Sequence, residues 1–545
     1  MVRLCYEETD EFIIFNKPIG LNTHAVDSGK DGLVEFLSEK LKQKLYPVSR
    51  LDQATSGIIL FAKASSVQKI SQLEADKEII KEYLLLTDRP FNLSRVHELD
   101  KCHFSLLKNH SEEKPHFLFK TEITQKDKIY KSHLNSQTNA ESEFSFVRKM
   151  GETYLWSVRL HTGKTHQIRL HCQNLQMPIL GDSLYQGTSF YRLCLHSGKL
   201  TFFGKSYESD LPLWAEEFAS QFLNLKRELQ ITLEAFEKRK LNYQVDSNDC
   251  FRWLHQEIPV LKLDQFGEYL YLYDYSSEAS FSGEVIELIS KFFKKSVFIR
   301  QMKNRGDDPN ENNLWIFRLQ EQKREKVIEP ISWIAYENGS KYELRTHQGL
   351  SPGLFLDQRE NRRWVFENSK GKNILNLFSY TGGFSLMAAV GGASGIDTVD
   401  VSQKFIQWSQ KNFEINDLVT SDSEKKFRFW VQDCLVFLKI AVKKRKKWDL
   451  IVLDPPTFGR SKFGVFQIEK NFDELLTNVS LLVSEGGKIL LSTNFEKWNY
   501  FDLISNVKKN LKGFNYEIFK APSQSLDFDY PHQNSLMKSM IIHIN

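Results

Sequence analysis

Residues 373–402 read NILNLFSYTGGFSLMAAVGGASGIDTVDVS and decide the fold of the second half of the chain. A strand-like apolar run, a glycine turn, a helix-like apolar run and a second strand-like run follow one another here. Strand-like runs recur at 428–434, 448–456 and 487–493, and a helix-like run follows the first of these. Strands that alternate with helices predict an α/β fold, a mainly parallel sheet with helices on both faces. Ligands of such sheets bind beyond the carboxyl ends of the strands, so the residues that follow each strand are the first candidates for a site.

The whole chain of 545 residues is too long for one domain, since roughly 100–200 residues per domain predicts three or four. Hydrophobic residues at 41% and charged residues at 26% exclude a wholly disordered protein. The formal charge of +4 excludes a protein that binds nucleic acid by bulk charge, although it allows a local basic face. The start MVRLCYEETDEF lacks the apolar core of a signal peptide, and no run reaches the ~18 apolar residues of a membrane span. We therefore expect a soluble, cytoplasmic protein that does not bind membranes.

The six cysteines form no CxxC pair. This spacing argues against a disulfide framework and against a zinc ribbon, so we expect no metal site. We interpret the cysteines as small buried side chains.

The pattern divides the chain into three parts, which we predict at 1–215, 216–330 and 331–545. In the first part, strand-like runs alternate with turn residues, which predicts a mixed, mostly antiparallel α+β domain; we expect loop and ragged strand at 101–143. The second part is predicted to begin with an amphipathic linker helix at 216–245, and to continue as a small α+β subdomain. Its predicted elements are strands at 268–275 and 296–302, a helix at 286–293 and a loop at 304–313.

Three motifs in the first part carry polar residues around apolar strands. They are SRLDQATSGIILFAK at 49–63, KEYLLLT at 81–87 and LHTGKTHQIRLHCQNLQMPILGDSLY at 160–185. Taken alone, an aspartate such as Asp52 in a turn is usually a cap. In order and spacing, however, the three motifs resemble those of the RluA-like RNA pseudouridine synthases, over roughly residues 1–205. The chain departs from the family pattern at Ser49, at Lys164 and at an inserted Gln186.

This resemblance implies an isomerase that converts uridine to pseudouridine without a cofactor. It assigns Asp52 as the nucleophile or essential catalytic carboxylate, Tyr83 as the ring that stacks on the target base, and Arg169 as the partner of Asp52. Arg50 would contact the RNA. The chemistry needs an ionised carboxylate beside the ribose, and a nearby guanidinium favours that charged form. An aromatic face can receive a uracil that has left its stack.

Four successive strand ends of the last part offer groups that suit a class I S-adenosylmethionine fold. The first leads into the glycines at 382–383, which let backbone amides approach a ligand at the start of a helix. Asp400 ends the second strand, Asp433 the third, and Asp454-Pro455-Pro456 the fourth. An acidic residue after the second strand binds ribose hydroxyls in many nucleotide folds.

Residues 331–545 resemble the RlmI/RlmK-like ribosomal RNA methyltransferases, which implies a mainly parallel seven-stranded sheet. The resemblance is carried by GLSPGLFLDQRENRRWV at 349–365, by QDCLVFLK and by VLDPPTFGRSK at 452–462. It implies that S-adenosylmethionine is the cofactor, with Asp400 on its ribose and Asp433 at its adenine edge. Asp454 and Pro455 would hold the target base, and Phe458 would stack on it. The residues implied for the methionine side of the pocket are Phe378, Tyr380, Thr381 and Gly382.

The methyl acceptor is predicted from nucleophilicity. Guanine N7 has a lone pair, so transfer to it needs only positioning. Cytosine C5 reacts only after a cysteine thiolate adds to C6. Thr457 rather than cysteine follows the Asp-Pro-Pro motif, and we expect Cys434 to serve packing or cofactor contact. These residues favour guanine N7 over cytosine C5.

Other polar residues have ordinary interpretations. The basic run at 443–447 either contacts phosphates or is a solvated surface. His161, His166 and His171 are expected to be structural or to contact RNA rather than to bind metal, and His347 is expected to be structural.

Together these features predict a bifunctional enzyme that modifies RNA, with its two sites on neighbouring targets. We expect 23S ribosomal RNA as the substrate, and transfer RNA is a second candidate for the first half. One alternative is an RNA-binding ribosome assembly factor in which one or both pockets are inactive. Another is a methyltransferase that acts on protein, DNA or a small molecule. The sequence leaves the oligomeric state open.

Overall fold

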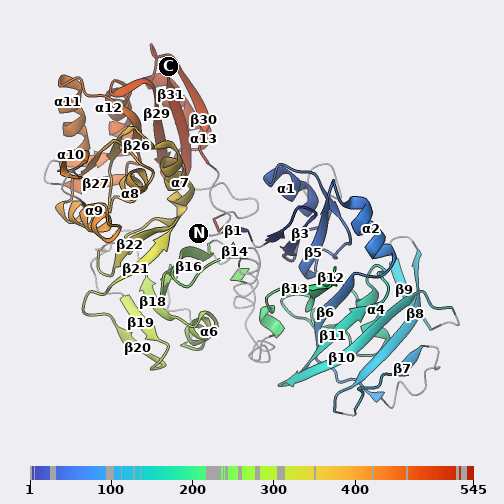
Figure 1. The fold of residues 1–545 in the computed structure, drawn as a ribbon. Coiled ribbons are helices and arrows are strands. Elements are labelled where there is room, and N and C mark those ends of the chain that lie inside the picture. The colour runs from blue at the N-terminus through green and yellow to red at the C-terminus, as the bar shows by residue number, and fades with distance from the viewer. Residues whose placement is uncertain are drawn as a thin grey trace. The chain divides into compact units, whose positions relative to one another are not determined.

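The computed structural model describes residues 3–4, 6–24, 32–93, 103–111, 113–126, 129–134, 137–215, 235–236, 239, 243–255, 260–275, 283–302, 314–348, 351–419, 423–461, 464–522, 527–528 and 537–545. The predicted linker helix at 216–245 lies largely outside the described residues, and the predicted loop at 304–313 lies wholly outside them. The chain forms two compact units, Arg3–Gln244 and Val245–Asn545 (Figure 1). The second unit contains both the predicted middle subdomain and the predicted α/β sheet.

The first unit is built on a twelve-stranded sheet. Its main path runs β2-β3-β5-β12-β6-β11-β10-β8-β7, with β13 beside β12, β4 beside β5 and β9 beside β8. The strands β5 and β12 pair in parallel, and the other pairs among the described strands of this sheet are antiparallel. The strands are β2 (Tyr6–Glu8), β3 (Phe12–Lys17), β4 (Leu45–Pro47), β5 (Ser56–Lys63), β6 (Ile80–Thr87), β7 (Phe104–Leu106), β8 (His116–Lys126), β9 (Ile129–His133), β10 (Ala140–Met150), β11 (Thr153–Leu160), β12 (Leu195–Phe202) and β13 (Lys205–Glu208). The other elements of the unit are α1 (Leu33–Lys40), α2 (Val67–Ala75), α4 (Gln167–Asn174), a 3-10 turn η1 (Leu213–Ala215) and the short pair β1 (Arg3–Leu4) and β14 (Tyr243–Gln244).

The expectation of loop and ragged strand at 101–143 is wrong for much of that stretch. The strand β8 is eleven residues long and pairs with β10 on one side and with β7 and β9 on the other. Phe117, Phe119, Thr121 and Ile123 alternate inward along β8, while Leu118, Lys120 and Glu122 between them are partly exposed. This is the period of a half-buried strand. The many polar residues of 101–143 led to the prediction of a loop with ragged strand.

The second unit begins with a six-stranded sheet in the order β15-β16-β17-β18-β19-β20. Its strands are β15 (Cys250–Leu254), β16 (Leu261–Phe266), β17 (Tyr269–Asp274), β18 (Ser296–Gln301), β19 (Leu314–Arg318) and β20 (Lys323–Lys326), and helix α6 (Gly283–Phe293) connects β17 to its parallel neighbour β18. A hairpin of β21 (Ser332–Glu337) and β22 (Ser340–Arg345) follows, and then a 3-10 turn η3 (Leu356–Gln358) and helix α7 (Arg359–Asn368).

The rest of the second unit is a seven-stranded sheet in the order β25-β24-β23-β26-β29-β31-β30. The first five strands in this order pair in parallel, whereas β31 pairs antiparallel with both of its neighbours. The strands are β23 (Asn373–Leu377), β24 (Gly395–Asp400), β25 (Phe427–Val431), β26 (Trp448–Leu453), β29 (Val483–Thr493), β30 (Tyr516–Lys520) and β31 (Lys538–Ile544). The helices are α8 (Gly383–Val390), α9 (Gln403–Ile415), α10 (Ser423–Lys426), α11 (Cys434–Lys443), α12 (Ile468–Ser480) and α13 (Tyr500–Asn510), and a hairpin of β27 (Phe458–Ser461) and β28 (Gly464–Gln467) follows β26.

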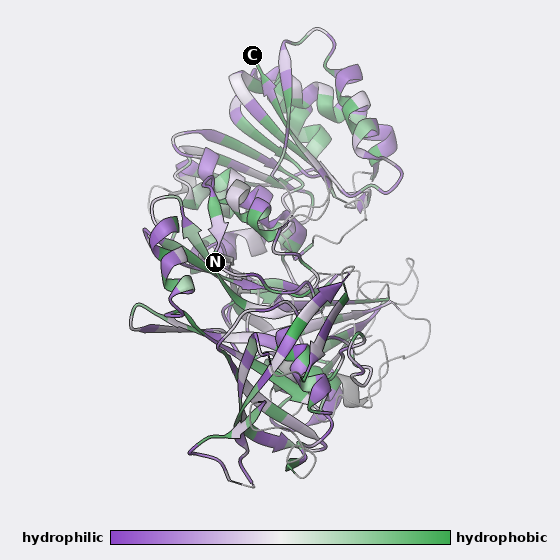
Figure 2. Cartoon of the chain, turned by 90° about the vertical axis from the view of Figure 1, so that its right-hand side faces the viewer, coloured by the Kyte–Doolittle hydropathy of each residue, from purple (hydrophilic) through white to green (hydrophobic). Residues whose placement is uncertain are grey.

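The seven-stranded sheet is apolar on both faces. One face and its helices bury Ile374, Ile396 and Val452, and the other buries Leu375, Val399 and Ile451. Strands covered on both faces read as continuous apolar runs, as the predicted strands here do. In Figure 2 the strands of this sheet are rich in hydrophobic residues, and the helices carry hydrophilic residues as well. The parallel strands place their carboxyl ends at one edge, where the candidate site lies.

Two candidate active sites

Asp52 lies in the turn that leads into β5. The Thr55 backbone N–H donates to the Asp52 carbonyl at 3.0 Å, which closes the turn. Gly57 then enters β5 with φ of +110°, and a Cβ there would lie 2.2 Å from the carbonyl oxygen of Ser197 on β12. Only glycine allows this approach of the two parallel strands. The Thr-Ser-Gly motif therefore fixes the start of β5, and the Asp52 side chain stays 27% exposed.

Arg169 on α4 reaches Asp52, but Asp182 is its main partner. Its Nη1 lies 3.5 Å from Asp52 Oδ2. Its Nε and Nη2 donate to the two carboxylate oxygens of Asp182 at 2.8 and 2.7 Å. Burial alone would lower the pKa of Arg169, but the hydrogen bonds and charge of Asp182 outweigh it and raise the pKa. The expected pairing of Arg169 with Asp52 is present as a longer contact, and the bidentate ion pair with Asp182 holds the guanidinium in place.

Tyr83 lies on β6, opposite Ser197 of β12. Its side chain is buried at 8% exposure, and burial raises the pKa of its hydroxyl, while a hydrogen bond with Ser197 opposes that rise. The ring therefore offers little open surface before a base arrives, and its stacking role stays a prediction. Arg50 is exposed next to the turn of Asp52, where it is open to solvent.

Two residues at this site had no predicted role there. His166 Nε2 lies 3.6 Å from Asp52 Oδ2. Its Nδ1 lies 2.7 Å from the hydroxyl of Tyr185, and the Arg169 guanidinium lies 4.9 Å from the centre of the Tyr185 ring. Both residues, like Asp182, stand in the motif at 160–185. The motif therefore indicates that polar residues gather near the site, but it does not show which of them face Asp52.

Lys17 also has no predicted role at this site, although it stands in the apolar run FIIFNKPIG. Its side chain is fully buried, and its ammonium donates to the carbonyls of Pro18 and Leu21 at 2.9 Å and of Gln53 at 3.3 Å. Burial lowers the pKa of Lys17 to about 7, with a further contribution from Arg192. The Asp52 turn is therefore tied to β3 through the carbonyl of Gln53.

In the second unit, the turn after β23 is held in an unusual conformation. Phe378 and Tyr380 have φ of +56° and +49°, a region that side chains other than glycine rarely adopt. The Phe378 N–H donates to the Cys434 sulfur at 3.3 Å, and the Tyr380 N–H donates to Asp400 Oδ2 at 2.9 Å. The predicted strand 373–380 ends at Leu377 for this reason. Backbone held in this way at the carboxyl edge of a sheet is a frequent feature of ligand sites.

Gly382 starts helix α8 with φ of +77°, and a Cβ there would lie 1.8 Å from the Ser409 hydroxyl of α9. The glycine thus allows two helices to approach each other at this edge. The adjacent Thr381 hydroxyl donates to the Gly353 carbonyl at 2.6 Å. Its side chain therefore supports the turn, its carbonyl accepts from the Asn412 amide at 2.9 Å, and its predicted cofactor contact stays a prediction.

Asp400 ends β24 and is 8% exposed. Its two oxygens accept backbone N–H groups of Tyr380 and Ser402 at 2.9 and 2.8 Å. Burial raises the pKa of Asp400 to about 6, although these hydrogen bonds oppose the rise. Each carboxylate oxygen has a further lone pair, so the carboxylate can also accept from ribose hydroxyls and fits the predicted nucleoside part of S-adenosylmethionine.

Asp433 does not end the third strand as expected. The strand β25 stops at Val431, and Asp433 is the N-cap of α11, where its Oδ1 accepts from the N–H groups of Leu435 and Val436 at 3.0 and 3.1 Å. The capping preference of aspartate explains this position. Cys434 next to it is 3% exposed, and burial raises the pKa of its thiol well above the ordinary value.

Asp454 follows β26 and is the end of a buried hydrogen-bond chain. Ser492 donates to its Oδ1 at 2.7 Å, and Gln358 donates to Ser492 at 3.0 Å. Burial raises the pKa of Asp454 to about 7, while the bond from Ser492 opposes the rise. Pro455 is buried, whereas Phe458 on β27 is 49% exposed, as a ring that stacks on a base must be.

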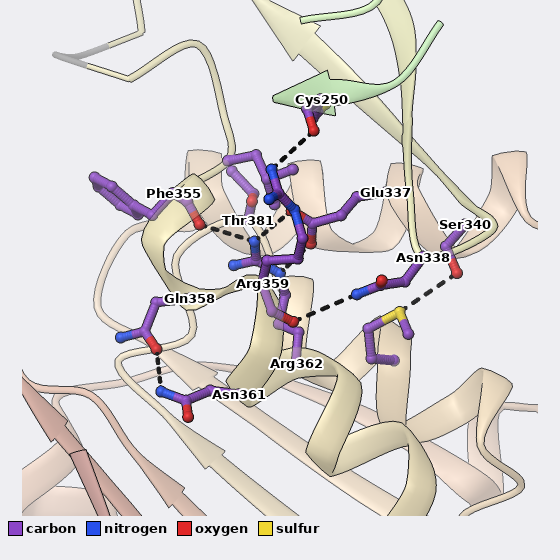
Figure 3. A network of polar contacts seen from close by, with 12 residues as sticks. Cys250, Glu337, Asn338, Ser340, Phe355, Gln358, Arg359, Asn361, Arg362 and Thr381 are labelled. Atoms are coloured by element: carbon purple, nitrogen blue, oxygen red, sulfur yellow. Dashed lines mark hydrogen bonds and ion pairs between the residues drawn. The ribbon is translucent and has the colours of Figure 1, made fainter. Parts of the chain in front are cut away.

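Charged residues of the motif at 349–365 lie on helix α7 and form a buried network of ion pairs. Arg362 donates to both oxygens of Glu337 at 2.6 and 2.9 Å, and Arg359 donates to the Cys250 carbonyl at 2.9 Å (Figure 3). Arg359 also donates to Asp527 at 2.9 Å. The Arg359 Nε also lies 3.5 Å from Glu337. All four charged side chains are at most 3% exposed. This network joins the six-stranded sheet and the hairpin to helix α7, which begins directly after Gln358.

Several polar residues have protein partners away from the two sites. His161 pairs with Glu143 at 3.0 Å, His171 lies 2.9 Å from the Thr121 hydroxyl, and His347 lies 3.1 Å from the Val327 carbonyl. Cys172, Cys194, Cys250 and Cys434 are buried thiols, and Cys5 and Cys102 lie outside the described residues.

The basic run 443–447 is exposed between α11 and β26, at the amino edge of the sheet. It therefore lies opposite the edge that carries Asp400 and Asp454. Within the described ranges, no helix is long and apolar enough to cross a membrane, and no group of three or more His, Cys, Asp or Glu side chains is placed to hold a metal ion.

Curated relatives include large-subunit ribosomal RNA methyltransferases K/L. One from Shewanella pealeana is 34% identical over 260 residues, which is 46% of this chain and 35% of the relative. One from Shewanella sp. strain ANA-3 is 31% identical over 335 residues, which is 59% of this chain and 45% of the relative. The chain thus spans less than half the length of either relative. A solved structure of a SAM-dependent methyltransferase from Streptococcus mutans covers 55% of this chain and 76% of its own, with 23% identity and a TM-score of 0.47.

Two family models match separate parts of the chain. Residues 11–174 match the model of RNA pseudouridylate synthase, and residues 323–509 match the model of S-adenosylmethionine-dependent methyltransferase. The matches fall on the segments that carry Asp52 and Asp400, which confirms the two resemblances found in the motifs. Within one chain, a segment similar to RNA pseudouridylate synthases is therefore followed by a segment similar to S-adenosylmethionine-dependent methyltransferases.

Proposed function

We propose that this protein is a bifunctional RNA-modifying enzyme that isomerises uridine to pseudouridine in its first unit and methylates an RNA base in its second. The observation that carries the first activity is the partly exposed Asp52 carboxylate with Arg169 Nη1 3.5 Å away. A carboxylate beside a fixed cation, open to solvent on one side, suits attack at C1′ or proton removal from the ribose. Tyr83 and Arg50 would hold the flipped base and the RNA.

The methyltransferase site supports the second activity through its strand ends. Asp400 would accept from the ribose of S-adenosylmethionine, and Phe378, Tyr380, Thr381 and Gly382 would line its methionine side with Asp433 near the adenine. When bound, that cofactor supplies an electrophilic methyl group on a sulfonium. Asp454, Pro455 and Phe458 would orient the acceptor base. We propose the class I fold for residues 331–545, with the pseudouridine-synthase domain at 1–215 and a linking subdomain at 216–330.

Guanine N7 is the acceptor that the side chains favour over cytosine C5. The C5 reaction needs an accessible thiolate, but Cys434 is buried with a raised pKa and accepts an N–H from Phe378. Thr457 stands after the two prolines, and its hydroxyl lies 3.3 Å from Asn494 Oδ1. Transfer to N7 needs no covalent intermediate, only alignment.

We propose 23S ribosomal RNA as the substrate and the cytoplasm as the place of action. The relatives are named for methylation of large-subunit ribosomal RNA, and both motif sets resemble enzymes of RNA. The alternative is a ribosome assembly factor that binds RNA with one or both pockets inactive. A binder gains nothing from carboxylates such as Asp52 and Asp400 facing polyanionic RNA.

The test is nucleoside analysis of unmodified 23S ribosomal RNA after incubation with the full-length protein and labelled S-adenosylmethionine. Wild-type protein should yield pseudouridine and one labelled base. Asp52→Ala should lose only pseudouridine, and Asp400→Ala should lose only the label, so each variant is the folding control of the other. Unmodified RNA with wild-type protein would favour the assembly-factor alternative, and pseudouridine from Asp52→Ala would contradict the role of Asp52.

A further inference from the structure

Asp52 faces a second donor besides Arg169, and both approach the same oxygen. Arg169 Nη1 is 3.5 Å and His166 Nε2 is 3.6 Å from Oδ2, the oxygen that each donor approaches most closely, and no hydrogen bond to Oδ1 is found in the described part of the chain. Both distances exceed that of a formed hydrogen bond, which is common for catalytic groups before a substrate binds. One oxygen is therefore flanked by donors while the other is left to meet the ribose.

The contacts of His166 decide which ring nitrogen carries the proton. An ionised carboxylate only accepts hydrogen bonds, so His166 can donate to Asp52 once the site closes on a substrate only if its Nε2 carries the proton. In a neutral imidazole, Nδ1 is then an acceptor, and the Tyr185 hydroxyl at 2.7 Å is placed to donate to it. Tyr185 is itself held under the Arg169 guanidinium at 4.9 Å. The tautomer of His166 is thus set by a residue that does not touch Asp52.

The backbone and the charge state of His166 suit this role. It has φ of +58° at the N-cap of α4 and makes no side-chain capping bond, so its ring nitrogens are not used to cap the helix. Burial lowers the pKa of His166, the carboxylates of Asp52 and Asp182 oppose this, and Arg169 adds to it. The rings of Tyr130 and Tyr185 pack on it at 5.2 and 5.6 Å. The imidazole is therefore neutral near pH 7.

We propose that His166 is a positioning residue of the isomerase, which together with Tyr185 holds Oδ2 of Asp52 so that Oδ1 is presented to the ribose. This inference rests on the proposed pseudouridine synthase activity. Isomerisation breaks N1–C1′ and forms C5–C1′; a proton then leaves C5, and N1 takes one from solvent. The proposal places His166 in the first of these steps, before any proton leaves C5.

The first experiment measures steady-state isomerisation of ribosomal RNA by the full chain. His166→Ala should lower kcat roughly 10-fold to 100-fold, as expected for loss of a donor to a charged group. KM should stay within about twofold, because His166 is not assigned to RNA binding. Tyr185→Phe removes only the hydroxyl and should lower kcat by a smaller factor. His166→Gln keeps an N–H at similar reach and should recover part of the loss.

Two matched controls isolate the effect. Tyr130→Phe removes the hydroxyl from the other ring that packs on His166, and His161→Ala removes an imidazole five residues away that pairs with Glu143. Both should retain wild-type kcat. Thermal unfolding of each variant checks the fold; if His166→Ala does not fold, Tyr185→Phe decides the question. Wild-type kcat in both Tyr185→Phe and His166→Ala would overturn the proposal.

The second experiment identifies the step of isomerisation in which His166 acts. In RNA that carries 5-fluorouridine, the bond to C1′ can move to C5, but the final proton cannot leave because fluorine replaces it. His166→Ala should slow formation of this rearranged product by the same factor as for uridine. A normal rate of rearrangement, with only the uridine reaction slowed, would make His166 the acceptor of the C5 proton and overturn the positioning role.

The outcomes separate this inference from the proposed function. If the wild-type protein forms no pseudouridine, the function fails and the role of His166 fails with it. If wild type is active, Asp52→Asn is inactive, and both His166→Ala and Tyr185→Phe match wild type, only the inference is wrong.

Discussion

Replacement of Asp454 with asparagine should stabilise the protein at neutral and alkaline pH while it removes methyl transfer. Burial raises the pKa of Asp454 from 3.8 to about 7 in the folded state. Below pH 4 the carboxyl is neutral in the folded and the unfolded chain, so it costs no stability. As the pH rises to 7, the unfolded chain ionises freely and the folded chain does not, so stability is lost. Above pH 7 the loss is constant.

The size of the effect follows from the two pKa values. The difference between 3.8 and about 7, at ~1.4 kcal/mol per pH unit, gives an upper limit of about 4 kcal/mol. Asp454 is only partly covered by protein, so we expect about 2 kcal/mol. By the same relation, the gain from Asp454→Asn should be larger at pH 8 than at pH 5. Asparagine can still accept the hydrogen bond that Ser492 donates to Oδ1.

The assay is thermal unfolding of wild type and variant at pH 5, 6, 7 and 8, with methyl transfer measured in parallel. We expect Tm at pH 8 to rise by about 4 °C or more. Asp417→Asn is the control, since Asp417 is exposed with φ of +58°, a conformation that asparagine tolerates. A Tm difference for Asp454→Asn that does not grow between pH 5 and pH 8 would refute the reasoning.

Three further substitutions test other parts of the second unit. Cys434→Ser should retain methyl transfer within about twofold, because a buried thiol is not the nucleophile; complete loss of labelled base would instead favour cytosine C5. Gly382→Ala places a Cβ against the Ser409 hydroxyl at positive φ, so calorimetry should show S-adenosylmethionine affinity at least about tenfold weaker; unchanged affinity would contradict the packing of α8 on α9. Arg359→Met should destabilise the unit by about 3–5 kcal/mol in urea unfolding, because it leaves buried carboxylates without their partner, and a loss below about 1 kcal/mol would show that the network contributes little.

The sequence predicted the parallel sheet well because its strands are continuous apolar runs that end at glycine or acidic residues. The strands predicted at 373–380 and 448–456 extend past β23 and β26 by three residues each. The extra residues of the first include Phe378 and Tyr380, which turn away through positive φ. The sequence pattern cannot reveal this turn, because most of the residues at 378–380 are also common in strands.

The candidate isomerase site was predicted only in part. Asp52 and Arg169 lie within 3.5 Å as the motifs implied, but the motif order could not show that Asp182 takes two hydrogen bonds from the same guanidinium. Those partners meet because α4 and the following turn fold back on each other. His166 is predicted from sequence only as a structural or RNA-contacting histidine, because linear spacing does not show which residues at the start of α4 meet Asp52.

The sharing of Glu337 between Arg359 and Arg362 limits how this region can change. Loss of any one of these three side chains leaves a buried charge without its partner. Simultaneous replacement of all three by apolar residues of similar volume can instead be neutral or stabilising for the fold. A designer who wants a sturdier scaffold would therefore rebuild these positions as a block rather than one at a time. For the same reason, stepwise substitution of these residues during evolution passes through destabilised intermediates, whereas simultaneous substitution of the whole set does not.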